Sequence, residues 1–313
     1  MIITLHRVSE SLPKTFKANI SLYTKTKTLR RFILNMQEKK KQFVSLDKYL
    51  NSNNKKNYIS ITFDDGYLDN LNIAYPILKK LNIPFTIYVT TNFINNQNLP
   101  WWFLLEDYLV KNYLKRNNIC DNYESYQNKI FNDPKENAEF LKVRNKILDN
   151  VFDLKKLDKF NKFTHKRLGE RLFMNWHELK KISSDKLVTI GSHTISHKRL
   201  SNCSNEERNI EIIDSKNILE KNLEYKVNHF AYPFGGLKDF TKKDMSILKK
   251  NNYFSAVSTI SRNSLINNDK FMFPRFSLSE EYKNPLHIYE KVSHTNLRNI
   301  SKDLLIYTYR KII

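Results

Sequence analysis

The sequence predicts an α/β barrel, and three features of the chain support this fold class. Short runs rich in apolar and β-branched residues, such as residues 59–63 and 84–94, are typical of buried strands. Segments with apolar residues at helical spacing alternate with these runs, as in residues 70–83 and 204–223. Polar clusters follow several of the strands directly, which is where α/β barrels place their active groups.

Residues 59–94 contain the clearest strand, helix and strand unit. Ile59, Ile61 and Phe63 share one strand face by period-two alternation. Pro76 is compatible with the following helix because it stands near the helix start. A unit of this kind joins two parallel strands through a right-handed crossover.

Residues 101–172 interrupt this alternation. They are rich in Lys, Asn and Glu, with helical periodicity and no clear strand, so we expect a helical insertion. Beyond it, the helix that begins near Ser204 has a capping box with Glu207. The other expected elements are a strand within residues 1–8, helices at 175–183 and 241–251, and strands at 187–192, 227–234, 253–259 and 271–278. We expect one domain over residues 1–313, including a C-terminal helical segment at 284–313.

Composition narrows the classes of protein that fit. The 313 residues are 40% hydrophobic, which is enough for a full-sized core. The net charge of +21 suggests anionic partners. The excess positive charge is spread over Lys- and Asn-rich segments that contain no nucleic-acid-binding motif, so we expect no specific nucleic-acid partner. Cys120 and Cys203 form no C-x-x-C pair, so ordinary thiols are expected.

The cellular location is predicted from two features that the sequence lacks, a membrane-spanning segment and a secretory signal. The apolar runs are shorter than the roughly 18–20 residues that span a bilayer. The start, MIITLHRVSES, has no basic region followed by a long apolar region, which argues against a secretory signal. We therefore expect a cytoplasmic protein.

Asp64 and Asp65 end the strand at residues 59–63, and Gly66 permits a sharp turn after them. Taken alone, this stretch could be a simple turn. In a barrel, both carboxylates would point into the mouth, where one can hold a metal ion and the other can accept a proton from water.

His193 and His197 directly follow another strand, and their spacing places both rings on one side of a helical turn. Two histidines at this spacing often occur on a protein surface by chance, without a functional role. Together with a strand-end carboxylate in the same barrel, two neutral imidazoles make a site for a divalent metal.

The third cluster is HFAYPFGG, residues 229–236. Pro233 fixes the backbone, and Gly235 and Gly236 permit close approach, so the Phe234 amide can face a developing oxyanion. A strand followed by an ordinary Pro-Gly turn is the alternative interpretation.

The motifs TFDDG, SHTISH, YPFGG and FPRFSL, in this order, resemble the polysaccharide deacetylase family, carbohydrate esterase family 4, also called the NodB-homology domain. The resemblance covers residues 1 to about 280, except the insertion, and implies a distorted (β/α)7-type barrel. It implies that Asp64 is the catalytic base and that Asp65, His193 and His197 hold a divalent metal. Zinc suits these ligands best, with cobalt, nickel and manganese as alternatives. It also implies that Phe234 lends its amide to the oxyanion hole.

Two positions depart from the pattern of many members. The arginine expected two residues before Pro233 is Ala231, and the resemblance implies that Arg275, in the later PR motif, holds Asp64 instead. No C-terminal strand carries the general-acid histidine. The N-terminal IITLHR resembles that strand in a circularly permuted form, so His6 would be the acid. A strand-end histidine that pairs with a surface carboxylate is the alternative.

The resemblance implies a sugar deacetylase acting on an N-acetylated, or alternatively O-acetylated, sugar of a glycan or glycan precursor. A deformylase or another linear or cyclic amide hydrolase is the alternative enzyme. A non-catalytic glycan or membrane-surface adaptor is the alternative from another class. Because we expect a cytoplasmic location, a nucleotide-linked or lipid-linked precursor is the expected substrate, and its phosphates would suit the positive charge.

Two further features keep alternative interpretations. Trp101 and Trp102 open the insertion and either line a substrate groove, where aromatic rings stack on sugars, or anchor the insertion to the barrel. Residues 296–313 carry an apolar helical stripe beside basic residues, which packs on the barrel or lies peripherally on an anionic membrane at the inner face. Five histidines receive no role: His165, His177, His229, His287 and His294.

Overall fold

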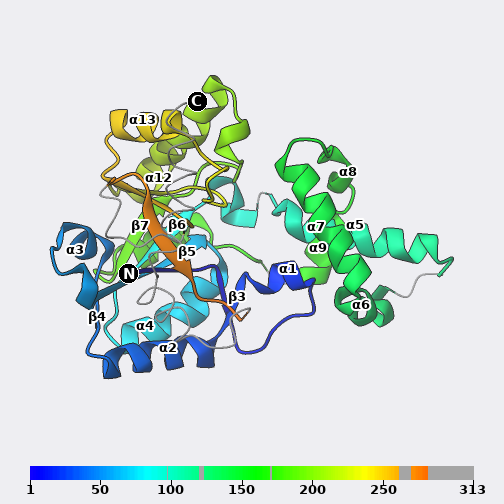
Figure 1. Ribbon diagram of the computed structural model, residues 1–313, viewed down its shortest axis with the longest axis horizontal. Coiled ribbons are helices and arrows are strands. Elements are labelled where there is room, and N and C mark those ends of the chain that lie inside the picture. Colours follow the sequence, from blue (N-terminus) through cyan, green and yellow to red (C-terminus); the bar gives the residue numbers. More distant parts are fainter. Residues whose placement is uncertain (97, 120–122, 170, 261–268, 281–313) are drawn as a thin grey trace, which may run out of the picture.

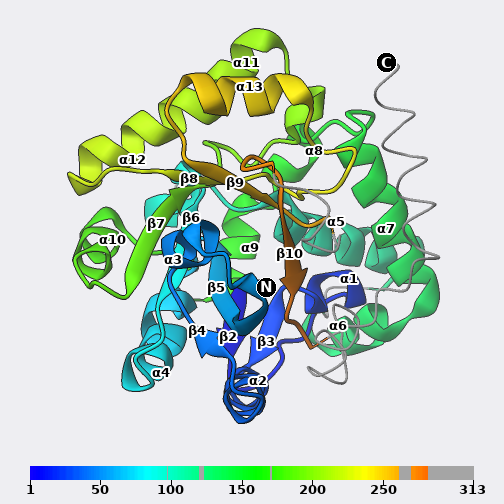
Figure 2. The ribbon, with the colours of Figure 1, turned by 60° about the vertical axis from the view of Figure 1, so that its left-hand side comes forward.

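The computed structural model describes residues 1–96, 98–119, 123–169, 171–260 and 269–280. In this part of the chain seven parallel strands close into a barrel, in the order β1, β10, β9, β8, β7, β6, β5 and back to β1 (Figure 2). Their bounds are β1 Ile2–Leu5, β5 Tyr58–Asp65, β6 Phe85–Val89, β7 Val188–Ser192, β8 His229–Ala231, β9 Ser255–Ser258 and β10 Phe273–Ser277. The predicted (β/α)7-type barrel is therefore confirmed.

The N-terminal strand closes the barrel. β1 pairs in parallel with β10, where Ile2 faces Arg275, and with β5, where Leu5 faces Phe63. The first and last described strands of the barrel thus lie side by side, as the permuted form implies. Because the neighbouring strands are parallel, the residues at their carboxyl ends meet at one mouth.

Helices surround the barrel, and the longer ones bury an apolar face against it. In α2, Thr26–Glu38, the side chains of Leu29, Phe32, Ile33 and Met36 are all buried. The capping box predicted at Ser204 and Glu207 is present at the start of α11. The other outer helices are η2 Asn70–Ala74, α4 Tyr75–Lys80, α10 Trp176–Ser183, α11 Asn205–Asn209, η5 Ile210–Asp214, α12 Ser215–Leu223 and α13 Lys242–Lys250.

Several short elements are not anticipated by the sequence patterns. They are β2 Arg7–Ser9, α1 Lys17–Ile20, β3 Tyr23–Lys25, β4 Gln42–Phe43, α3 Leu46–Asn51, η1 Lys55–Asn57, η3 Thr91–Asn96 and η4 Leu200–Asn202. β2 pairs with β3, and β4 pairs with the start of β5. Such two- and three-residue strands are too short for a periodic pattern to reveal them.

The insertion is helical, as predicted, and has its own core. Its helices are α5 Trp101–Arg116, α6 Tyr123–Asn132, α7 Pro134–Leu148, α8 Lys155–Asp158 and α9 Asn161–Leu168. Figure 1 shows them gathered beside the barrel, on the side away from α3. Their apolar residues form a cluster that also includes Tyr67, Phe93 and Phe173 from loops of the barrel. The insertion is thus packed onto the barrel loops.

A buried ionic cluster strengthens the insertion. The Arg167 guanidinium contacts Glu106 at 3.1 Å and Asp107 at 2.7 Å. Asn19, from α1, donates to Glu106 at 2.8 Å, and Thr164 donates to Asp107 at 2.5 Å. These contacts satisfy charges that would otherwise be costly to bury.

The C-terminal segment at 284–313, with its proposed apolar stripe and with His287 and His294, lies outside the described residues. No helix in the described part of the chain combines the length and the apolar character needed to cross a membrane. The bounds of the single predicted domain stay a prediction.

Candidate active site

Asp64 and Asp65 end β5 at the barrel mouth, and both are almost completely buried. The backbone turns immediately after them, with φ of 76° at Asp65 and 81° at Gly66. The predicted sharp turn is therefore present. A glycine tolerates this left-handed conformation, whereas an aspartate in it costs about 1–3 kcal/mol, and such strain concentrates at functional sites.

Asp65, His193 and His197 meet in space. One ligand atom from each lies within 4.8 Å of the others, and all three residues are buried. The Asp65 Oδ1 atom is 3.7 Å from His193 Nε2 and 3.5 Å from His197 Nε2. These separations exceed ordinary hydrogen bonds, and a metal ion at about 2 Å from each ligand would fit between atoms spaced in this way.

The loop that carries the two histidines differs from the sequence prediction. The spacing predicted one side of a helical turn, but residues 193–197 form no helix. Thr194 and His197 have φ of 70° and 58°, and the two rings approach edge to face with centroids 4.8 Å apart. The residues meet as predicted because strained backbone, rather than helical spacing, brings them together.

Glu211 holds this loop, although no sequence motif points to it. Its carboxylate, on η5, accepts from the backbone N–H groups of Ile195 and Ser196 at 2.9 Å each and from the Ser196 hydroxyl. Glu211 is 4% exposed. An isolated acidic residue in a long helix carries no pattern that would reveal this contact.

The three ligand residues satisfy a chemical test for a divalent metal. Neither oxygen of Asp65 has a hydrogen-bond partner in the described chain, although both are buried. The Tyr67 hydroxyl lies near enough to lower the pKa of Asp65, yet outside normal hydrogen-bond geometry. Burial has the largest effect on Asp65, followed by the charge of Asp64. Both outweigh the effect of Tyr67 and raise the pKa of Asp65 well above its usual value. A cation would relieve both effects.

The imidazoles are also prepared for a metal. Nδ1 of His193 lies 2.7 Å from the Ala231 carbonyl oxygen, which fixes the ring and leaves Nε2 directed to Asp65. Burial lowers the pKa of His193 to about 4 and that of His197 well below its usual value. Both rings are therefore neutral at neutral pH, the form that binds metal. This ligand set fits zinc and related divalent ions.

Arg275 holds Asp64 in a bidentate ion pair. Its two terminal nitrogens lie 2.6 Å and 2.7 Å from the Asp64 oxygens, and Nη1 also donates to Thr62 at 3.2 Å. Burial alone would raise the pKa of Asp64, but the guanidinium lowers it below its usual value. Asp64 is thus ionised and fixed in orientation.

His6, at the end of β1, lies beside Asp64. Its Nε2 atom is 4.0 Å from Asp64 Oδ2, and Asn70 donates to its carbonyl oxygen at 2.8 Å. Burial lowers the pKa of His6 although the Asp64 charge opposes this shift. The structure therefore brings the predicted acid to the predicted base, instead of to a surface carboxylate.

Phe234 completes the set of predicted residues. It has φ of 61°, followed by 69° at Gly235, where an added Cβ would lie 2.8 Å from the Thr259 nitrogen. The Phe234 ring packs edge to face on His197, with centroids 4.8 Å apart. Within the described residues its N–H donates to no backbone or side-chain acceptor. The Phe234 N–H is therefore free to donate to a substrate oxygen, and its residue lies beside the candidate metal ligand His197.

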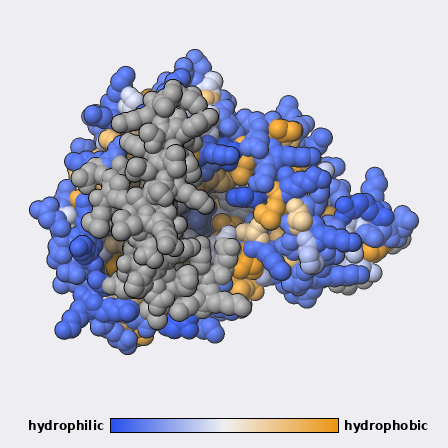
Figure 3. Space-filling model, in the orientation of Figure 1, coloured by the Kyte–Doolittle hydropathy of each residue, from blue (hydrophilic) through white to orange (hydrophobic). Residues whose placement is uncertain are grey.

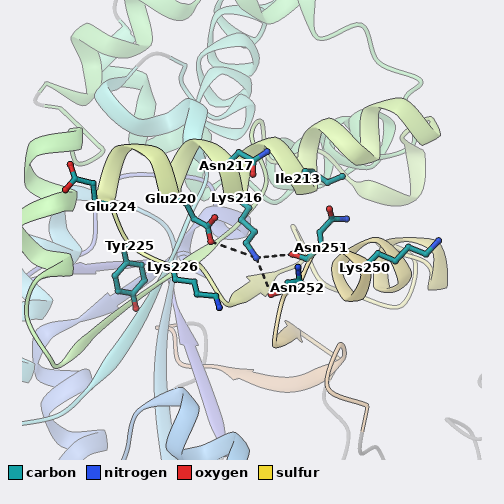
Figure 4. A pocket seen from close by; sticks show the side chains of 10 residues that line it. All are labelled: Ile213, Lys216, Asn217, Glu220, Glu224, Tyr225, Lys226, Lys250, Asn251 and Asn252. Atoms are coloured by element: carbon teal, nitrogen blue, oxygen red, sulfur yellow. Dashed lines mark hydrogen bonds and ion pairs between the residues drawn. The ribbon is translucent and has the colours of Figure 1, made fainter.

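A cavity away from the barrel mouth has no comparable group of candidate metal ligands in its lining. It measures about 630 Å³ and lies between α12 and the end of α13 (Figure 4). There the Lys216 ammonium donates to the carbonyl oxygens of Asn251 and Asn252 at 3.0 Å and 3.2 Å and lies 3.9 Å from Glu220. Lys216 caps the carbonyl groups at the end of α13, so we interpret this cavity as a structural feature without a catalytic role.

His229, which the sequence analysis left without a role, belongs to a second histidine cluster. Its Nδ1 atom lies 2.9 Å from the Ser255 hydroxyl, and its Nε2 atom lies 3.1 Å from Asp47 on α3. Serine, histidine and aspartate in this order suggest a catalytic triad. Ser255 is completely buried, however, so no substrate reaches it, and the cluster ties α3 to the barrel.

Comparisons with known proteins bear on both the fold and the family. A model of the polysaccharide deacetylase family matches residues 51–253. No match was found among curated protein sequences.

Solved structures that share the fold include the following three. The Streptococcus pyogenes deacetylase PplD in complex with acetate superposes with a TM-score of 0.60 at 18% identity, covering 93% of this chain and 96% of that one. A putative polysaccharide deacetylase from Bacillus anthracis has a TM-score of 0.57 at 14% identity, with coverages of 93% and 68%. IcaB from Ammonifex degensii has a TM-score of 0.54 at 14% identity, with coverages of 90% and 92%.

Proposed function

The chain belongs to the polysaccharide deacetylase family, and from this premise we propose a metal-dependent hydrolase that removes the acetyl group from an N-acetylated sugar of a glycan or glycan precursor. The observation that carries the proposal is the division of labour between the adjacent aspartates. Asp65 presents two unpaired oxygens to two neutral imidazoles, while Asp64 is held ionised by Arg275. O-acetylated sugars remain the alternative substrate class.

In the proposed site Asp65, His193 and His197 hold the cation. A divalent cation bound there supplies Lewis-acid polarisation of an acetyl carbonyl and a lowered pKa for water. Zinc is the proposed metal on ligand type.

Asp64 is the proposed general base. It accepts a proton from the water whose oxygen forms the new bond to the acetyl carbon. The bidentate contact with Arg275 keeps both carboxylate oxygens fixed while this happens. The negative charge that develops on the carbonyl oxygen is stabilised by the Phe234 N–H.

His6 is the proposed general acid. Because burial keeps its ring neutral, it must first take up a proton, and Asp64 is a donor only 4.0 Å away once it has accepted one from water. His6 then gives this proton to the nitrogen of the sugar as the carbon–nitrogen bond breaks. One water proton thus moves to the amine, and the products are the free amino sugar and acetic acid, which releases its proton to become acetate.

The test uses purified protein that is stripped by a chelator and reloaded with single defined metals. We expect acetate release from acetylated sugars to disappear on stripping and to return with zinc or a related ion. Release of formate or a ring-opened product instead would support another amide hydrolase. Metal-independent sugar binding without any hydrolysis would contradict the proposal in favour of an adaptor.

The expected cytoplasmic location stays a prediction, as do the nucleotide-linked or lipid-linked form of the substrate and peripheral contact with an anionic membrane. If phosphates on the carrier are recognised by the positive charge, activity should fall when the carrier is removed, and the difference should shrink in high salt. Equal rates with and without the carrier at all salt concentrations would reject this part of the proposal.

A further inference from the structure

A cleft of about 320 Å³ opens beside the metal ligand His197. One wall is the start of α5 with Trp101 and Trp102, and another is α8 with Leu157. Residues 92–93, which follow β6, complete it from the barrel side. The cleft therefore joins the insertion to the proposed active site.

The lining of the cleft is amphipathic. Aromatic and aliphatic side chains share it with polar groups at Asn92, Asn98, Asp158 and Ser196. Apolar side chains also gather on the insertion side of the face drawn in Figure 3. A pyranose ring has the matching character, because its C–H faces pack on aromatic rings and its hydroxyl groups reach hydrogen-bonding partners at the edges.

Size and polarity favour one sugar ring over a lipid chain. The volume is near the lower limit of roughly 300–1,000 Å³ for small-molecule sites. A lipid tail would cover Asn92, Asn98 and Asp158 without supplying hydrogen bonds, which is unfavourable. A sugar hydroxyl can bond to each of them.

We propose that this cleft binds the sugar residue next to the acetylated one, and that Trp101 is its stacking surface. The inference rests on the proposed deacetylase function and adds an extended substrate to it. The enzyme would then favour oligosaccharides over a single acetylated sugar, because the second ring supplies binding energy outside the reacting centre.

Trp101 is a better probe of the cleft than Trp102. The Trp102 ring is 6% exposed and packs edge to face on His197, with centroids 5.1 Å apart, so its removal would disturb a metal ligand. Trp101 is half-buried and packs edge to face on Trp102 at 5.5 Å. Among the described ring contacts Trp101 has none with His197, so its replacement removes no direct contact to a proposed metal ligand.

The first experiment measures binding without turnover. The chain has three tryptophans, and Trp176→Phe leaves tryptophan fluorescence only from the two that line the cleft. The stripped Trp176→Phe protein is titrated with N-acetylglucosamine oligosaccharides of one to four residues in β-1,4 and β-1,6 linkage. We expect an emission change that saturates at least about tenfold more tightly with the disaccharide than with the monosaccharide. No change with any oligosaccharide would overturn the proposal.

The second experiment compares KM with kcat for the loaded enzyme. Trp101→Ala should raise KM for the tetrasaccharide about three- to tenfold, the range expected for one lost aromatic contact, and leave kcat/KM for the monosaccharide unchanged. Trp101→Tyr should restore most of the difference. Trp176→Ala, at a half-buried tryptophan packed on the barrel core, is the matched control and should not alter the preference for length.

The two experiments separate failure of the inference from failure of the proposed function. If Trp101→Ala changes both substrates equally, or neither, the cleft is not a sugar subsite even though the enzyme is a deacetylase. If the unaltered enzyme releases no acetate from any sugar, the proposed function fails, and the fluorescence titration alone decides whether the cleft binds a sugar.

Discussion

The barrel mouth and the α3 side of the barrel each bring histidine together with aspartate, and they differ in how completely these groups are satisfied. Beside α3, His229 uses both ring nitrogens, one with Ser255 and one with Asp47. At the mouth, both Asp65 oxygens and Nδ1 of His6 and His197 have no hydrogen-bond partner among the described residues. Other buried polar atoms also lack a partner, but the Asp65 oxygens in addition converge with His193 and His197, and this combination suits the binding of a cation.

The backbone shows the same contrast. Asp65, Thr194, His197 and Phe234 all have positive φ at the mouth, whereas His229, Ser255 and Asp47 do not. Each non-glycine residue in this conformation costs about 1–3 kcal/mol, which the surrounding contacts must offset. Strain and unpaired groups together distinguish a site built for chemistry from a cluster that only supports the fold.

The largest expected effect comes from Asp64→Asn. Removing the proposed general base should lower kcat for acetate release by about 10²- to 10⁴-fold, while we expect the protein still to bind metal through the proposed ligands Asp65, His193 and His197. Asp47→Asn is the matched control, because it changes an aspartate beside His229 in the same way. Similar activity losses in the two variants, measured on protein shown to be folded, would remove the distinction between the two clusters.

Arg275→Met should affect both stability and activity. It leaves the Asp64 charge buried without a partner, which costs about 3–5 kcal/mol in the free energy of unfolding. Urea unfolding measures this change, and acetate release measures the accompanying loss of a fixed, ionised base. Adding Asp64→Asn should recover much of the stability without any activity. If the double variant is no more stable than Arg275→Met, the ion pair is not the source of the loss.

Glu211→Gln should weaken metal binding by about 10- to 100-fold, because this carboxylate fixes the loop that carries His193 and His197. The metal-dependent rise in melting temperature measures the affinity, since a ligand bound only to the folded state stabilises it by mass action. An exposed carboxylate on the same outer segment, Glu206, provides the control variant Glu206→Gln. Equal metal affinities in both variants would show that the loop does not depend on Glu211.

The smallest effect on activity is expected from His229→Phe. It leaves the buried Ser255 hydroxyl without its partner and should cost about 1–3 kcal/mol in the free energy of unfolding. The kcat of the folded enzyme should not change, because within the described part of the chain the ring contacts Ser255, Asp47 and Phe254 and none of the residues placed at the mouth. A marked fall in kcat at full folding would mean that the α3 cluster supports the site as well as the fold.

Much of this site was predicted from the sequence because its groups lie in short motifs. Asp64 and Asp65 end a strand that is predicted from its alternating apolar residues. Because the barrel is parallel, the carboxyl end of this strand must lie at the mouth. The family resemblance further assigned His6 and Arg275, and the barrel brings both to Asp64. The helical turn predicted for residues 193–197 is wrong, because two histidines four residues apart can also meet across a loop with positive φ angles.

The sequence alone determined the strand and helix alternation, the helical insertion and the residue types that can hold a divalent metal. Only the tertiary structure decided which carboxylates stay unpaired, that Glu211 holds the histidine loop, and that Trp101 and Trp102 border a cleft beside His197. The physical reason is the separation along the chain between the residues that interact. Strands and helices follow from periodic patterns among near neighbours, whereas these contacts join residues far apart in the chain, whose proximity depends on how the barrel closes and where the insertion packs.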